Sequence, residues 1–86
     1  MSQVRFASFN SFLNRSNEGE LIENLSTPDD VQAQAVGEVL QRNRPDVVLL
    51  NEFDFDDEGT AIELFQQNYL SVAQAEGIDP IEYPYV

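Results

Sequence analysis

The pattern of apolar and polar positions predicts two β-strands with a helix between them. The first apolar run spans residues 4–10, and the second spans residues 47–50, directly after Pro45 and Asp46. The second run is too short for a helix and rich in β-branched residues, which is typical of a strand buried on both faces of a sheet. The first run carries apolar residues on both of its faces, which also favours a sheet with covered faces. Each run ends in polar residues, the first in Asn10 and the second in Asn51-Glu52.

Residues 28–44 carry apolar side chains at helical spacing. Thr27 is the expected N-cap, Pro28 fits the first helical position, and Pro45 stops the helix. We expect Gln41 on the polar face. The expected apolar face consists of Val31, Ala35, Val36, Val39 and Leu40.

Two further segments complete the expected elements. A second helix is predicted from about Thr60 to Ala75, with Gly77 as its stop. The connection over residues 11–27 reads as a long loop, in which Glu20–Leu25 can form a short helical turn. Loops of this length are often functional; the alternative is that apolar residues of the loop pin it to the core.

A strand, a helical connection and a second strand form a βαβ unit with parallel strands and a right-handed crossover. Parallel strands end at the same edge of the sheet, where α/β proteins bind ligands, so Asn10 and Glu52 are expected near one another. Glu52 could hold Mg²⁺ or Mn²⁺, with an amide oxygen from Asn10, because these cations take oxygen ligands. The alternative is a strand-end Glu that pairs with an Arg or caps a turn.

The charge balance restricts the possible partners. The chain has 16 acidic residues against four basic ones, all Arg, and a net charge of −12. Such a surface repels nucleic-acid backbones, so direct nucleic-acid binding is not expected, although a bound divalent cation can still attract a phosphate ester. Arg15, in the long loop, is the candidate phosphate contact, since Arg42 and Arg44 suit the negative end of a helix. The sequence contains no His, which removes any imidazole acid or base.

The acidic loop after Glu52 imitates part of a calcium-binding loop. Asp54, Asp56, Glu58 and Gly59 follow its spacing, but Phe65 stands where the closing bidentate Glu is needed. A solvated acidic loop ahead of a helix N-terminus is therefore favoured.

Targeting signals are not evident in the sequence. The chain has no Cys, no apolar run long enough to span a bilayer and no signal-peptide layout at its N-terminus. We therefore expect no membrane partner and a cytoplasmic location by default, or secretion if a leader has been removed.

The segments Val4–Asn10 and Arg44–Asp54 together resemble the endonuclease/exonuclease/phosphatase superfamily, which includes DNase I, inositol-phosphate phosphatases and sphingomyelinases. That family opens with a strand that ends in Asn, and its second motif is Pro-Asp, four apolar residues, any residue and Glu. Residues 45–52 match this motif. The bacterial branch with Asn-Glu-Phe-Asp and a long first loop is most similar, and the tail over residues 82–85 also looks like that branch.

The resemblance implies an α/β fold in which residues 1–86 form the N-terminal βαβ portion of a DNase I-like four-layered sandwich, with a second helix after the second strand. It implies Mg²⁺-dependent hydrolysis of phosphodiesters or phosphomonoesters, with Asn10 and Glu52 at the metal and Glu52 as the direct ligand. The family also uses a His–Asp pair and later motifs that this sequence lacks, so we expect the isolated chain to be inactive. The alternative is a non-catalytic acidic module that folds by dimerising or by pairing with a partner through open sheet edges.

Overall fold

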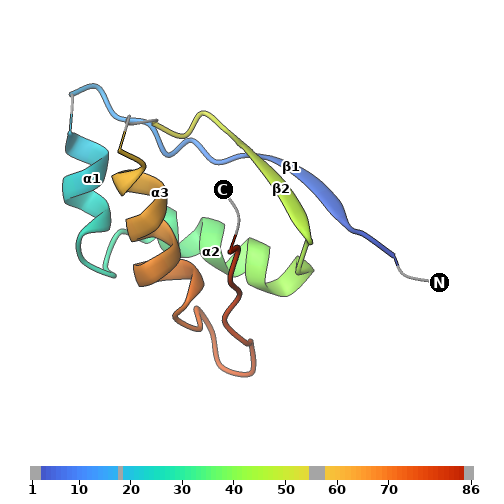
Figure 1. Ribbon diagram of the computed structural model, residues 1–86. Helices are drawn as coiled ribbons and strands as arrows, with labels where there is room; N and C mark the ends of the chain where they lie inside the picture. Colours follow the sequence, from blue (N-terminus) through green and yellow to red (C-terminus); the bar gives the residue numbers. More distant parts are fainter. Residues whose placement is uncertain (1–2, 18, 55–57, 85–86) are drawn as a thin grey trace.

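The computed structural model describes residues 3–17, 19–54 and 58–84, and within them it has mixed α/β content (Figure 1). Two parallel strands pair in a register that runs from Phe6 opposite Val47 to Asn10 opposite Asn51. The predicted parallel βαβ arrangement of the strands is confirmed. The elements are, in order, β1 (Phe6–Asn10), α1 (Glu20–Leu25), α2 (Val31–Asn43), β2 (Val47–Asn51), α3 (Thr60–Phe65) and the π-helical turn η1 (Gln66–Leu70).

The N-terminus of α2 lies later than predicted. Asp30, not Thr27, is the N-cap, and its Oδ2 atom accepts a hydrogen bond of 2.8 Å from the Ala33 N–H. The reason is a long-range contact: the Tyr69 hydroxyl donates to the Thr27 carbonyl at 2.6 Å and accepts from the Asp30 N–H at 2.9 Å. These bonds hold residues 27–30 as a turn before the helix. At the other end, α2 ends at Asn43, and Arg44 adopts a left-handed conformation (φ 49°) ahead of Pro45, so the predicted stop is confirmed.

The buried face of α2 differs from the predicted apolar stripe. Val31, Ala35 and Val39 are exposed, whereas Gln41 is only 1% exposed. The helix turns this way because its small residues let η1 approach closely: a Cβ atom on Gly37 would lie 3.4 Å from the Tyr69 carbonyl oxygen. The buried residues of α2 are Ala33, Val36, Gly37, Leu40 and Gln41.

The second helix begins at Thr60 as predicted but ends at Leu70, not at Ala75. Its last turn is π-helical, with the Ser71 N–H donating to the Gln66 carbonyl at 2.8 Å. The Gln41 amide group then ends the helix, because its Nε2 atom donates to the carbonyls of Tyr69, Leu70 and Val72 at 3.3, 3.1 and 2.8 Å. Its Oε1 atom accepts from the Gln74 N–H at 2.9 Å. These contacts replace the bonds that would have continued the helix.

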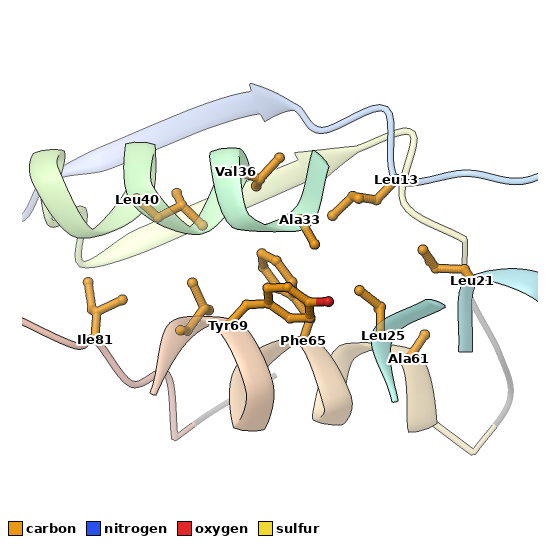
Figure 2. Packing of buried hydrophobic residues seen from close by; sticks show 11 residues of the cluster. Leu13, Leu21, Leu25, Ala33, Val36, Leu40, Ala61, Phe65, Tyr69 and Ile81 are labelled. Carbon is orange, nitrogen blue, oxygen red and sulfur yellow. The ribbon is translucent and has the colours of Figure 1, made fainter. Parts of the chain in front are cut away.

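The hydrophobic core lies between α2 and the α3–η1 segment, with α1 closing one end (Figure 2). Phe65 is its central ring, 5.8 Å from the Phe53 ring and 5.9 Å from the Tyr69 ring between centroids. Three leucines of the connection over residues 11–27 are buried in this core: Leu13, Leu21 and Leu25. They support the alternative in which apolar residues attach the long loop to the core. The core residues are Leu13, Leu21, Leu25, Ala33, Val36, Leu40, Ala61, Phe65, Tyr69, Leu70 and Ile81.

The sheet is covered on one face. The helices and the C-terminal segment lie on one side of the strands in Figure 1, and exposed and half-buried residues alternate along both strands. The prediction of strands buried on both faces is therefore wrong for this chain, because no element of the described residues packs on the second face. None of the helices in this part of the chain is both long and apolar enough to cross a membrane.

Candidate metal site at the strand ends

The structure brings the ends of β1 and β2 to one edge of the sheet, as the sequence predicts. Asn10 is the register partner of Asn51, and Glu52 directly follows Asn51. Both Asn10 and Glu52 are exposed to solvent. An amide at the end of β1 and a carboxylate directly after β2 therefore belong to the edge where parallel sheets bind ligands.

Ser11 holds the two strand ends together. Its N–H and its hydroxyl both donate to the Asn51 carbonyl, at 3.0 and 2.9 Å, and the hydroxyl also lies 3.4 Å from the Glu52 carbonyl oxygen. The Leu13 N–H donates back to the Ser11 Oγ atom at 3.3 Å. Ser11 itself is only 1% exposed. Sequence reasoning missed this residue, because its partners lie some 40 residues along the chain.

Both strands end in left-handed backbone. Glu52 has φ 54° and Phe12 has φ 52°, a region that costs a residue other than glycine roughly 1–2 kcal/mol. The first turn of α2 supports the backbone at Phe12, since the Gln32 Nε2 atom donates to the Phe12 carbonyl at 2.6 Å. Gln32 therefore supports the backbone just beyond β1, and Ser11 supports the backbone at the end of β2.

Arg15 is tied into the fold behind this edge. Its N–H donates to the Asp54 Oδ2 atom at 2.7 Å, while its guanidinium Nε donates to the Asn24 Oδ1 atom at 2.8 Å. The guanidinium also forms an ion pair of 3.4 Å with Asp30, the N-cap of α2. Arg15 thus joins the long loop to both α1 and α2, and it lines a cavity of about 220 Å³ together with Asp54. Its contact with a phosphate stays a prediction.

A hard cation that keeps most of its water ligands would need few protein donors at the strand ends. Mg²⁺ commonly binds one or two protein carboxylates and takes its other ligands from water and substrate. Asn10 and Glu52 offer oxygen donors of this kind. The ion pairs among the described residues, Arg15–Asp30 and Arg42–Glu38, do not include Glu52.

A closed protein cage for a metal is not formed by the described residues. They contain no group of three or more His, Cys, Asp or Glu side chains placed to hold an ion. Among the residues with the spacing of a calcium-binding loop, Asp54 accepts a hydrogen bond from the Arg15 backbone N–H, and Glu58 is exposed. Gly59 is the N-cap residue of α3 and has a left-handed conformation. Asp56 lies outside the described residues.

A larger apolar cavity of about 750 Å³ lies on the inner side of β2, and neither Asn10 nor Glu52 lines it. The C-terminal segment forms one wall: the Tyr83 hydroxyl donates to the Pro45 carbonyl at 2.6 Å, and its N–H donates to the Gln66 Oε1 atom at 2.9 Å. Burial, with the nearby Asp46 carboxylate, raises the pKa of the Tyr83 hydroxyl. This cavity is therefore separate from the strand-end site.

Comparison with models of known protein families, with curated proteins and with solved structures gives no match to this chain.

Proposed function

We propose that the chain is the N-terminal, metal-holding portion of a Mg²⁺-dependent phosphoesterase with a DNase I-like fold. The observation that supports this proposal most is the placement of Asn10 and Glu52 at the ends of adjacent parallel strands. The motif over residues 45–52 supports it from the sequence.

Each side chain has a distinct part in the proposed site. The Glu52 carboxylate would bind Mg²⁺ or Mn²⁺ directly, and the Asn10 amide oxygen would bind the ion or one of its waters. The bound cation would neutralise the charge of a phosphate ester, which the net charge of −12 otherwise repels. Ser11 would act as a positioning residue, because it fixes the backbone of Asn51 and Glu52.

The proposed site would bind the ion but would not supply the proton transfers of hydrolysis. It contains no His, and general acid–base catalysis needs a group whose pKa lies near the working pH. We therefore expect metal binding without turnover in the purified chain.

Isothermal titration calorimetry with Mn²⁺ tests the metal site. We expect Glu52→Gln to weaken binding at least tenfold and Asn10→Ala to weaken it less. The matched control is Glu63→Gln, an exposed acid on α3 that should leave the affinity within twofold. Equal binding by the wild type and Glu52→Gln would contradict the proposal, because it would show that the ion is held by the general acidic surface.

Hydrolysis of a generic phosphodiester tests the expected inactivity. We expect no turnover by the purified chain with Mg²⁺ or Mn²⁺. Turnover that Glu52→Gln abolishes would keep the metal site and overturn the view that the chain needs further residues for catalysis.

A second candidate function is a non-catalytic acidic module that pairs with another chain. The exposed second face of the sheet favours this candidate, since an apolar surface of this kind is typical of interaction sites.

A further inference from the structure

The uncovered face of the sheet exposes several large apolar side chains. Phe6 is 76% exposed, Leu49 is 61% exposed and Val47 is 48% exposed, and Val4 extends the surface just ahead of β1. The helices lie on the opposite side of the strands (Figure 1). We call this surface the outer face; within the strands it consists of Phe6, Ser8, Asn10, Val47, Leu49 and Asn51.

The outer face carries no charged side chain, although the chain has 16 acidic residues. The charges nearest in sequence, Arg5, Asp46 and Glu52, stand before or after the strands. Its polar groups are partly paired within the face, where the Asn51 Nδ2 atom donates to the Ser8 Oγ atom at 3.3 Å. Covering this surface would therefore remove apolar area from water without burying a charge.

The area suits a weak protein–protein interface. If a fully exposed aromatic side chain presents about 150–250 Å² and an aliphatic one somewhat less, the apolar side chains of the outer face with Val4 expose about 400 Å². Two such surfaces would bury about 800 Å² of apolar area, and their polar positions would raise the total to about 1,000 Å², the lower limit of specific interfaces.

We propose that the outer face is the interface of a homodimer, in which two copies of the chain stack their sheets face to face. A surface without charge is complementary to itself under a two-fold axis, which is the commonest symmetry of oligomers. Stacked sheets lie about 10 Å apart, so side chains make the contact. This dimer differs from pairing through open sheet edges, where backbone groups make the contact.

The charge of the chain gives this dimer a distinctive salt dependence. Each copy carries a net charge of −12, so two copies repel one another at low ionic strength. Screening acts over about 30 Å at 0.01 M salt and about 8 Å at 0.15 M salt. Salt should therefore strengthen the homodimer, whereas it would weaken a complex with a basic partner protein.

Sedimentation equilibrium of the full chain tests the proposal. We expect a dimer with a dissociation constant on the order of 10 μM at about 0.15 M salt, and at least tenfold weaker association at about 0.01 M salt. Leu49→Gln should weaken the dimer at least tenfold. The matched control is Val31→Gln on α2, where the wild-type side chain is 77% exposed, and it should leave the dissociation constant within twofold.

Several results would overturn the proposal. A monomer at all concentrations up to about 300 μM, thirty times the expected dissociation constant, would exclude the homodimer. A dimer that is insensitive to Leu49→Gln would indicate edge pairing, and equal weakening by Val31→Gln would indicate non-specific association. Circular dichroism checks that each variant is folded, and Phe6→Gln replaces Leu49→Gln if that variant does not fold. All of these measurements are made without Mg²⁺ or Mn²⁺, because the outer face includes Asn10, a proposed metal ligand.

Discussion

The helical layer and the sheet of this protein are built in opposite ways. The rings and leucines between α2 and the α3–η1 segment are almost fully buried, and every buried side-chain polar atom of the described residues has a hydrogen-bond partner. The outer face of the sheet instead exposes Phe6 and Leu49 to solvent. The difference indicates that the helical layer provides most of the stability, while the sheet carries the candidate metal site and the candidate interface.

Replacing Phe65 in the core and Phe6 on the outer face should have the most different effects on stability. Phe65 is fully buried between Phe53 and Tyr69, so Phe65→Ala should lower the free energy of unfolding by about 3–5 kcal/mol. A chain of this size has a total stability of only about 4–13 kcal/mol, so this loss is a large fraction of the total. Phe6→Ala, on the outer face, should cost less than about 1 kcal/mol. Urea denaturation followed by circular dichroism measures both, and equal losses would contradict the comparison.

Gln41 tests whether polar contacts also support the helical layer. Gln41→Leu keeps a similar volume but leaves the carbonyls of Tyr69, Leu70 and Val72 and the N–H of Gln74 without their partner. We expect a loss of about 2–3 kcal/mol in the free energy of unfolding.

The control for Gln41 is Gln67→Leu, at an exposed position of η1, which should change stability by less than about 0.5 kcal/mol. A neutral or stabilising Gln41→Leu would show that the carbonyls find water or another partner, and that the helix end does not depend on Gln41.

Tyr69 should make the helical layer sensitive to alkaline pH. Burial raises the pKa of its hydroxyl above 10.0, and the Asp30 and Asp29 carboxylates act in the same direction, although the Asp30 N–H hydrogen bond opposes them. Because the folded-state pKa is the higher one, this contribution to stability is complete below about pH 10 and is lost as the pH rises through the folded-state value.

Tyr69→Phe separates this effect from other alkaline changes. It should cost about 1–2 kcal/mol at neutral pH, since the Thr27 carbonyl and the Asp30 N–H lose their partner. It should also reduce the fall in stability above about pH 10. Some fall should remain, because the pKa of Tyr83 is raised as well. An unchanged alkaline profile in the variant would contradict the assignment to Tyr69.

The sequence allowed the local features to be predicted better than the long-range ones. The strands, their parallel pairing and the shared edge of Asn10 and Glu52 follow from apolar runs and from the geometry of βαβ units. The burial of Gln41 did not, because it depends on carbonyls of η1 that lie some 30 residues later. The N-cap at Asp30 likewise depends on Tyr69, and the positioning of Glu52 by Ser11 depends on pairing across the sheet.

The smallest expected effect separates the two faces of a single strand. Leu49 lies on the outer face, and Val48 lies half-buried on the inner face against the core. Thr is β-branched and keeps the strand propensity, so Leu49→Thr should change the free energy of unfolding by less than about 0.5 kcal/mol, whereas Val48→Thr should cost about 1 kcal/mol. Urea denaturation at a protein concentration of about 1 μM, where a weak dimer dissociates, measures this difference. If Leu49→Thr costs as much as Val48→Thr, the outer face is covered in solution, and a loss that grows with protein concentration identifies the cover as a second copy of the chain.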